Sequence, residues 1–306
     1  MLGAPARAEA RLSIVATTGM LADAARQVGG DRAQVRALMG PGVDPHAYRQ
    51  TRSDVVALAK ADLALWHGLY LEAQLEPLLR DLARTRPVVA AAEALPPEEL
   101  LANADYPDRN DPHVWMDPTL WAQVVAAVRD AMIAAAPDAR RAFEDNAARH
   151  VAEIAALGDY ASTALASVPA DSRVLVTAHD AFHYLARAYG FEVVGVQGVS
   201  TESEAGLSRI AAIVDLLVSR DVKAVFVESS VSDRNMRALI EGAAAAGHAV
   251  AIGGELFSDA MGAEGSYEGS YIGMIDHNVT TIARALGGDA PARGMRGRLS
   301  ASEPVR

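Results

Sequence analysis

The sequence predicts an α/β protein of two lobes, each built on a parallel β-sheet, that are joined by a single long connecting helix. Two observations predict the lobes: short β-branched runs alternate with helical periodicity in residues 11–136, and this alternation resumes in residues 169–287. A third observation predicts the connection, because the intervening residues read as one uninterrupted helix. The length of 306 residues also fits two domains of about 150 residues each.

The N-terminal lobe, residues 11–136, is predicted from runs rich in Val, Leu and Ala that amphipathic stretches separate. Parallel strands need a crossover connection, and the amphipathic stretches supply helices for it. The predicted strands are 12–17, 34–39, 62–66 and 87–91, and the predicted helices are 20–28, 53–60, 71–85 and 118–136.

Residues 137–168 are predicted to form the connecting helix. From 138 to 167 the chain has no Pro and a single Gly, and apolar residues supply one broad hydrophobic face. A helix of this span is about 45 Å long, which is enough to run the height of a domain. We expect a rigid connector, since the Gly/Ser-rich composition of a flexible hinge is absent. The apolar face consists of Phe143, Val151, Ile154, Leu157 and Leu165.

The C-terminal lobe, residues 169–287, repeats the alternation of the first lobe, and residues 288–306 are predicted as a tail. Residues 1–10 carry the A-x-A spacings of a signal-peptide cleavage site without the apolar stretch that precedes one. They are either the remnant of an export signal or an Ala-rich disordered start. The predicted strands of the lobe are 173–177, 193–196, 224–227 and 249–252, and the predicted helices are 181–189, 204–220, 233–246 and 271–286.

Composition narrows the functional classes. The 28 Lys and Arg against 39 Asp and Glu give a net charge of −11, and no basic cluster could neutralise a phosphate backbone, so nucleic acid is not an expected partner. An acidic chain suits cations instead. The absence of Cys excludes disulfides, thiolate metal sites and Cys nucleophiles, which leaves His, Asp and Glu as the strong ligands. No window approaches the roughly 18 apolar residues of a membrane span.

Four segments place a metal-ligating residue just after a predicted strand or in a loop stiffened by Pro. They are GVDPHAY with His46, NDPHVWMDP with His113, VTAHDAF with His179 and ELFSDAMG with Asp259. In parallel sheets the ligand crevice lies outside the carboxyl ends of the strands, so His46 and His179 are expected to face one cleft from different lobes. In each Asp-Pro-His, the Pro restricts the backbone and the Asp is a candidate acceptor for the free ring N–H.

Taken singly, each His is more simply an ordinary loop or core residue, but three His and one Asp in a Cys-free chain favour a metal site. Three imidazoles and one carboxylate suit zinc and are tolerated by manganese. His183 follows His179 at helical spacing, but the segment lacks the Glu of an HExxH motif, and we interpret His183 as a helix-surface residue. The remaining histidines are placed on helix surfaces or at element ends: His67, His150, His248 and His277.

At these segments the sequence resembles the zinc/manganese solute-binding proteins of ABC importers. The resemblance runs from about residue 12 to residue 286, nearly the whole chain, and its motifs occur in the order that the family shows. It implies two α/β lobes joined by one long helix, with the metal between them, in agreement with the helix predicted above. The motifs are ADLALWHGLYLE, DPHVWMDP, VTAHDAFHYLARAYG, STESEAGLSRI, VFVESSVSDR, ELFSDAMG and YIGMIDHNVTTIARAL.

The resemblance also implies a ligand set. Manganese-type members often carry Glu where His179 stands, so a third imidazole favours Zn²⁺, with Mn²⁺ as the alternative ion. Glu202 lies in the loop that supplies that Glu in some relatives and is a candidate outer or substitute ligand. The His-rich acidic loop of many zinc-specific members is missing, since residues 92–110 contain no His, and this weakens the zinc assignment. The ligands implied are His46, His113, His179 and Asp259.

In function, the resemblance implies a periplasmic protein, expected to be a monomer, that captures a divalent metal and delivers it to a cognate ABC permease in the inner membrane. No lipid-attachment Cys follows residues 1–10, which favours a soluble periplasmic protein over a lipoprotein. The alternative from the residues alone is a zinc hydrolase that uses the three His. A catalytic zinc keeps one position for water, whereas Asp259 offers a fourth protein ligand here. Nucleotide-dependent enzymes are excluded, because neither glycine-rich phosphate motif follows a strand.

In the segment VFVESSVSDR, Ser229 or Ser230 beside Glu228 is a candidate catalytic serine, but the segment lacks the G-x-S-x-G elbow. We therefore interpret Glu228, Asp233 and Arg234 as a polar network that stabilises the lobe. The three Trp are interpreted as core or shielding residues, with Trp115 placed to keep water from the metal.

Overall fold

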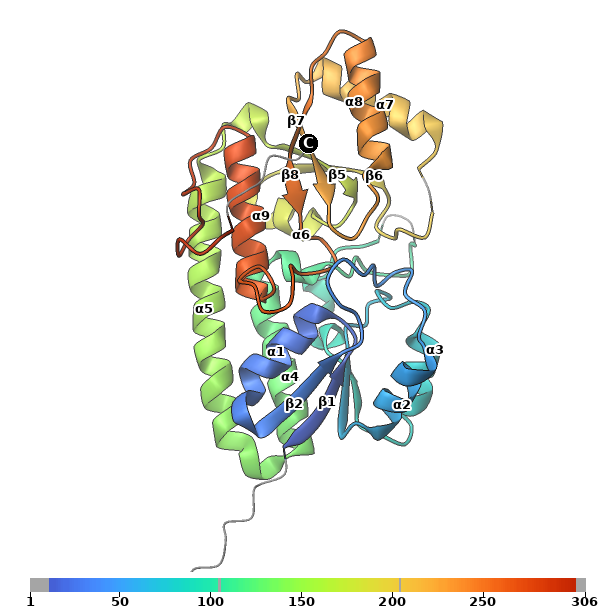
Figure 1. Cartoon of the computed structure of the whole chain (residues 1–306), viewed down its shortest axis with the longest axis vertical. Coiled ribbons are helices and arrows are strands. Elements are labelled where there is room, and N and C mark those ends of the chain that lie inside the picture. The colour runs from blue at the N-terminus through green and yellow to red at the C-terminus, as the bar shows by residue number, and fades with distance from the viewer. Residues whose placement is uncertain (1–10, 104–105, 204, 301–306) are drawn as a thin grey trace, which may run out of the picture.

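The computed structural model describes residues 11–103, 106–203 and 205–300, and it shows two α/β lobes stacked along one long helix (Figure 1). The predicted fold class is thereby confirmed. The segment 1–10, predicted as a signal remnant or disordered start, lies outside the described residues, as do residues 301–306 of the predicted tail.

The N-terminal lobe is a parallel four-stranded sheet in the order β2-β1-β3-β4, with helices on both faces. Strand residues alternate between the faces: Ile14 packs toward α1 and α4, whereas Val15 packs with the apolar residues of α2 and α3. The elements are β1 (Leu12–Ala16), α1 (Gly19–Gly29), β2 (Ala33–Ala37), α2 (Arg52–Lys60), β3 (Leu63–Trp66), α3 (Glu76–Leu82), β4 (Val88–Ala90) and α4 (Pro118–Ala135), with short 3₁₀ turns at Gly30–Arg32, Ala92–Ala94, Pro97–Glu99 and Val114–Met116.

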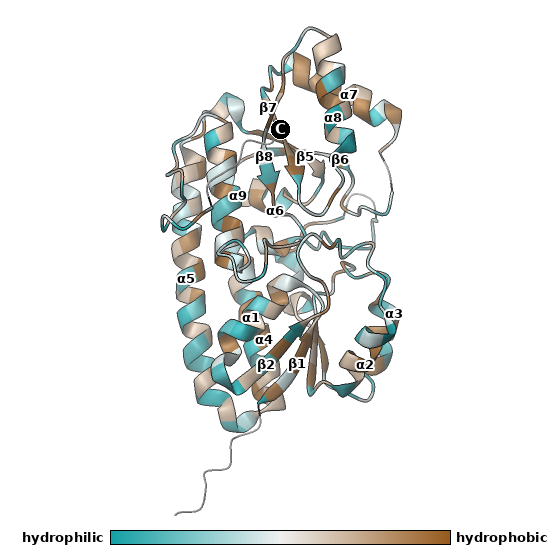
Figure 2. Ribbon diagram, viewed as in Figure 1, coloured by the Kyte–Doolittle hydropathy of each residue, from teal (hydrophilic) through white to brown (hydrophobic). Residues whose placement is uncertain are grey.

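The connecting helix is α5 (Arg140–Ala166), 27 residues long, and a 3₁₀ turn at Pro137–Ala139 leads into it. Its length is about 40 Å. Phe143, Ile154 and Leu157 of the predicted apolar face are buried, and α5 packs on α1 and α4 of one lobe and on α9 of the other. Figure 2 shows hydrophilic and hydrophobic residues interleaved along α5, as in an amphipathic helix. The helix is therefore anchored to both lobes along its length.

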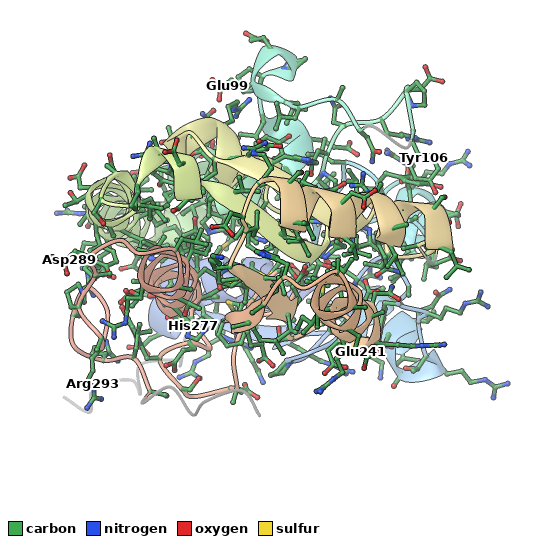
Figure 3. All side chains as sticks on the ribbon, turned by 90° about the horizontal axis from the view of Figure 1, so that it is seen from above. Glu99, Tyr106, Glu241, His277, Asp289 and Arg293 are labelled. Atoms are coloured by element: carbon green, nitrogen blue, oxygen red, sulfur yellow. The ribbon has the colours of Figure 1, made fainter. Side chains whose placement is uncertain are left out.

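The C-terminal lobe contains two parallel strand pairs, β5-β6 and β7-β8, with β5 adjacent to β7. Side chains fill the space between these strands and the surrounding helices (Figure 3). The elements are β5 (Val174–His179), α6 (His183–Tyr189), β6 (Glu192–Gln197), α7 (Leu207–Ser219), β7 (Ala224–Glu228), α8 (Arg234–Ala245), β8 (Ala251–Leu256) and α9 (Tyr271–Ala285), with a 3₁₀ turn at Ala170–Ser172 before β5.

The predicted helix 71–85 is wrong at its start, since α3 begins only at Glu76. Residues 71–75 form turns instead, with the N–H of Leu75 donating to the Glu72 carbonyl, and they follow a turn in which Gly68, Leu69 and Tyr70 have positive φ, of 84°, 53° and 69°. The helices predicted to begin at 181 and 204 also begin later, at His183 and Leu207.

One hydrophobic cluster runs through both lobes. It joins Ile14 of the N-terminal sheet and Leu157 of the connecting helix to Phe226 of the C-terminal sheet. The two lobes therefore share part of their core through α5 and α9 rather than meeting only at a hinge. Within the described residues, none of the helices is long and apolar enough to cross a membrane.

We predict that Leu157→Ala lowers the free energy of unfolding by about 2–5 kcal/mol, because the substitution leaves a cavity in a fully buried position. Thermal unfolding followed by circular dichroism measures the loss. The matched control is Arg141→Ala on the same helix, where the side chain is 95 % exposed and the expected change is below about 0.5 kcal/mol. Equal effects of the two substitutions would contradict a connector packed into the shared core.

Candidate metal centre

His46 and His113 are both held by the Asp-Pro-His turn in which they occur. The Asp44 carboxylate accepts the backbone N–H of His46 at 2.8 Å, and the Asp111 carboxylate accepts that of His113 at 3.0 Å. A short polar side chain that bonds the backbone two residues on closes an Asx turn, and the intervening Pro limits the alternatives. The same local motif therefore fixes both imidazoles in the N-terminal lobe.

His179 and Asp259 come from the C-terminal lobe. His179 is the last residue of β5, and Asp259 follows the end of β8. Both positions lie at the carboxyl edge of parallel strands, where ligand crevices of open α/β sheets form. Two candidate ligands from each lobe thus face the junction between the lobes.

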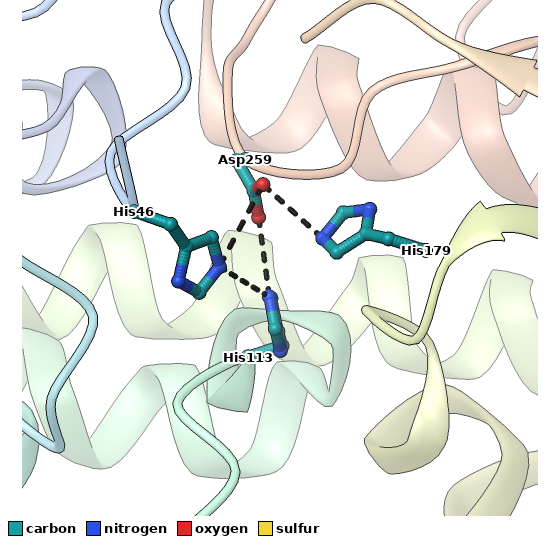
Figure 4. A group of neighbouring side chains, drawn as sticks. All are labelled: His46, His113, His179 and Asp259. Atoms are coloured by element: carbon teal, nitrogen blue, oxygen red, sulfur yellow. Dashed lines mark hydrogen bonds and ion pairs between the residues drawn. The ribbon is translucent and has the colours of Figure 1, made fainter. Parts of the chain in front are cut away.

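The four side chains converge on one point (Figure 4). The Nε2 atoms of His46 and His113 are 3.3 Å apart, and Nε2 of His113 and of His179 each lie 3.2 Å from an Asp259 oxygen. His46 is more distant from the carboxylate, at 3.9 Å. One ligating atom from each residue can be chosen so that all four lie within 4.8 Å of one another.

Burial leaves these polar atoms without ordinary partners. The four residues are 0–3 % exposed. Nε2 of His179 and both oxygens of Asp259 make no hydrogen bond within the described residues. The Asp259 oxygens nevertheless lie 3.2 Å from Nε2 of His113 and of His179. Buried polar atoms are normally satisfied, and lone pairs that point at a common centre instead are those of a cation site.

Two buried carboxylates orient two of the imidazoles from behind. Asp111 lies 2.7 Å from Nδ1 of His113, and Glu228 lies 2.5 Å from Nδ1 of His179 and also accepts the backbone N–H of that residue. A carboxylate at Nδ1 holds the proton there, and Nε2 is then free to ligate with increased basicity. Each of these pairs is therefore suited to present Nε2 to a metal.

The prediction that both neighbouring Asp residues accept a ring N–H is right for Asp111 and wrong for Asp44. The second oxygen of Asp44 accepts the hydroxyl of Thr201 at 2.5 Å, from the opposite lobe. This oxygen thus faces a loop of the C-terminal lobe rather than the ring of His46. Asp44 therefore ties the lobes together beside the site.

The carboxylates determine the charge of the cluster. Burial alone would lower the pKa of His113. The adjacent carboxylates of Asp111 and Asp259 outweigh this effect and raise the pKa to about 9. The pKa of His179 is likewise raised well above its usual value against the effect of burial, chiefly by Glu228. Burial dominates for His46 and lowers its pKa to about 3. Although burial opposes it, the imidazoles hold the pKa of Asp259 well below its usual range.

Two residues near the cluster, Glu202 and His183, lie outside the group of converging ligand atoms. Glu202 is exposed and accepts a hydrogen bond from Gln74 at 2.6 Å, so its loop directs it to the rim rather than to the cluster. His183 is not a free surface residue: its side chain is 33 % exposed, and Nδ1 lies 3.2 Å from the outer oxygen of Asp111. His183 therefore helps to orient the Asp111 carboxylate, which in turn orients the ring of His113.

The predicted network of Glu228, Asp233 and Arg234 is also wrong. Glu228 turns inward to His179, while Asp233 pairs with Arg237, one helical turn away on α8. Glu228 ends β7, the neighbour of the strand that ends in His179, so only the pairing of the strands could have revealed its role. His150, placed on a helix surface, is in fact buried on the inner face of α5.

Trp115 shields the cluster, as the sequence suggested. It is fully buried, its ring centroid lies 5.2 Å from that of His113, and its Nε1 donates to the carbonyl of Ser258 at 2.8 Å. The indole therefore covers one side of the site and fastens the residue before Asp259.

Comparison with known proteins decides the family. The family described as "Zinc-uptake complex component A periplasmic" matches residues 14–285. The chain belongs to this family. The resemblance drawn from the sequence motifs is thereby confirmed.

Relatives and solved structures agree with this membership. The chain is 44 % identical to the manganese-binding lipoprotein MntA of Bacillus subtilis (strain 168), over 91 % of each chain, and 43 % identical to the zinc-binding protein TroA of Treponema pallidum (strain Nichols), over 92 % of this chain and 91 % of that one. The solved structure of periplasmic zinc-binding protein TroA from Treponema pallidum superposes with a TM-score of 0.88, covering 90 % of this chain and 99 % of that one.

Membership of the zinc-uptake component A family identifies the chain as an extracytoplasmic, metal-binding component of an ABC importer and not as an enzyme. This membership argues against the alternative interpretation of the chain as a zinc hydrolase. The family also implies a cognate ABC permease as the partner. The relatives bind different metals by name, so the family alone leaves the choice between zinc and manganese open.

We predict that Glu228→Gln weakens zinc binding by about 10- to 100-fold, because the carboxylate no longer holds the Nδ1 proton of His179. Competition with a chromophoric chelator measures the affinity. Glu202→Gln is the matched control at the rim, and its affinity should stay within about twofold of the original chain. Similar losses in both variants would mean that general charge, not the contact with His179, attracts the metal.

We predict that zinc binding strengthens as the pH rises from 6 to about 9. In the metal-free chain His113 and His179 are protonated at neutral pH because their pKa values are raised, and only neutral imidazoles ligate. Each proton displaced weakens the apparent affinity about tenfold for every pH unit below its pKa. Calorimetric titration in buffers of different ionisation enthalpy counts the protons released. An affinity that is flat from pH 6 to 9 would refute this charge distribution.

Proposed function

We propose that the protein captures Zn²⁺ in the periplasm, with His46, His113, His179 and Asp259 as its four ligands, and delivers the ion as a monomer to an ABC permease in the inner membrane. Mn²⁺ is the secondary cargo. The proposal extends the family assignment in four respects: the identity of the ion, the residues that hold it, the compartment, and the monomeric state.

The spacing of the ligand atoms is the observation that supports this proposal best. Zinc takes four ligands in a tetrahedron at about 2.0–2.1 Å, and the ligands of such a tetrahedron are about 3.3 Å apart. The His46–His113 nitrogens are 3.3 Å apart, and the His113 and His179 nitrogens lie 3.2 Å from the first and the second oxygen of Asp259, respectively. The four chosen ligating atoms are at most 4.8 Å apart, so the side chains would have to draw closer together to complete the tetrahedron around one ion.

The kind of ligand favours the same ion. Three imidazoles and one carboxylate form a nitrogen-rich set, which zinc accepts readily, whereas manganese prefers carboxylate, carbonyl and water oxygens in an octahedron. For any such set zinc also binds more strongly than manganese in the usual order of divalent metals. Manganese then remains a cargo where zinc is scarce.

Delivery follows from the division of the ligands between the lobes. His46 and His113 belong to the N-terminal lobe, and His179 and Asp259 to the C-terminal lobe. The cluster is almost fully buried, so the ion leaves only when the two halves of the ligand set separate. A permease that contacts both lobes can therefore trigger release by a small relative displacement.

We predict that His46→Ala, His113→Ala and His179→Ala each weaken zinc binding by more than about 100-fold, beyond the roughly 10- to 100-fold cost of losing an outer partner. Native mass spectrometry with metal analysis shows whether one zinc is retained and whether the chain is a monomer. His277→Ala, which removes a ring that lies 2.9 Å from the Glu255 carbonyl and contacts Phe257, should keep its zinc. A histidine variant that retains zinc at the original affinity removes that residue from the proposed set.

A further inference from the structure

Three consecutive residues that follow β3 have left-handed backbone conformations, which is unusual where two of them are not glycine. Gly68, Leu69 and Tyr70 have φ values of 84°, 53° and 69°. Glycine adopts such values freely, but Leu and Tyr rarely do, because their Cβ atoms then crowd the backbone. Strained backbone of this kind persists where surrounding contacts enforce it, and it gathers at functional sites.

Glu72 holds the start of this turn. One carboxylate oxygen accepts the Thr17 hydroxyl at 2.6 Å and the backbone N–H of His67 at 2.7 Å, and the other accepts the backbone N–H of Gly68 at 3.2 Å. Glu72 is completely buried, and burial raises its pKa. A buried carboxylate is costly to retain, so its placement against the turn indicates that the turn itself has a task.

The turn aims the ring of His67 at the segment that carries His113. Nε2 of His67 lies 2.7 Å from the carbonyl oxygen of Pro112, which can only accept, so Nε2 carries the proton. The other ring nitrogen has no hydrogen-bond partner within the described part of the chain. His67 is fully buried, and its single directed hydrogen bond therefore falls on the residue before His113.

His67 also reaches the segment of Asp259 through Trp115. The two rings meet edge to face with centroids 5.0 Å apart. Trp115 in turn lies against His113 and donates to the carbonyl of Ser258, the residue before Asp259. One imidazole outside the ligand set thus braces the supports of two candidate ligands that come from different lobes.

We propose that His67, held in place by Glu72, is a positioning residue that fixes the distance between His113 and Asp259 and thereby makes the site select zinc over manganese. This inference rests on the proposed function and adds the source of its selectivity. A short, fixed separation of these two ligands suits the four-coordinate zinc site. A looser pair admits water and further oxygen ligands, which favours manganese relative to zinc.

The test compares His67→Phe with His248→Phe. His248 is a matched control, because its Nε2 also lies 2.7 Å from a backbone carbonyl, that of Val222, which is in the C-terminal lobe away from the cluster. His67→Gln retains a donor that can reach Pro112, and Glu72→Gln loosens the turn while leaving the ring of His67 intact. For each variant, chelator competition gives the zinc and manganese affinities, and the visible spectrum of bound Co²⁺ reports whether the site is tetrahedral.

We expect His67→Phe and Glu72→Gln to weaken zinc binding by about 10- to 100-fold and manganese binding far less, with a weaker tetrahedral Co²⁺ band. His67→Gln should restore most of the zinc affinity, and His248→Phe should change neither ratio nor spectrum. Thermal unfolding shows whether His67→Phe is folded. If it is not, the zinc-to-manganese ratios of Glu72→Gln and His67→Gln test the inference. An unchanged zinc-to-manganese ratio and spectrum in folded variants overturns this inference alone, whereas an original chain that binds no zinc overturns the proposed function.

Discussion

The candidate metal centre depends on a buried carboxylate, that of Asp259, which faces three buried imidazoles. A buried charge of this kind needs compensation. Against the effect of burial, the pKa values of His113 and His179 are raised, first by Asp111 and Glu228 and next by Asp259, which favours protonated imidazoles when no metal is bound. A divalent cation replaces those protons with greater charge at the same point. Metal binding at this site therefore displaces protons from the imidazoles.

The fold delivers these groups by two means of different range. Asp-Pro-His turns set His46 and His113 locally, whereas adjacent parallel strands bring Glu228 to His179. Asp111 and Glu228 then stand behind the imidazoles, and Trp115 closes one side. The long helix α5 and the core shared between the lobes hold the two halves of the site in a fixed relative position. Small movements of the lobes would therefore control the access of the metal to the site.

Sequence reasoning succeeded where the signal was local. Strand-helix alternation, the Pro-free connector and the positions of His46, His113, His179 and Asp259 all have short-range signatures. It failed where the determinant was a distant contact. The turn before α3 contains Glu72, whose buried carboxylate is bonded by Thr17, 55 residues away, and the partner of Glu228 lies 49 residues away. Glu202 was misplaced because Gln74, 128 residues away in the other lobe, holds its side chain at the rim.

X-ray absorption at the zinc edge of the metal-loaded protein tests the central claim most directly, since it reads the shell around the ion without any substitution. The proposed site predicts four nitrogen or oxygen ligands at about 2.0–2.1 Å, with the outer-shell scattering of three imidazole rings. A shell of six ligands dominated by oxygen, or scattering from fewer than three imidazoles, would contradict it.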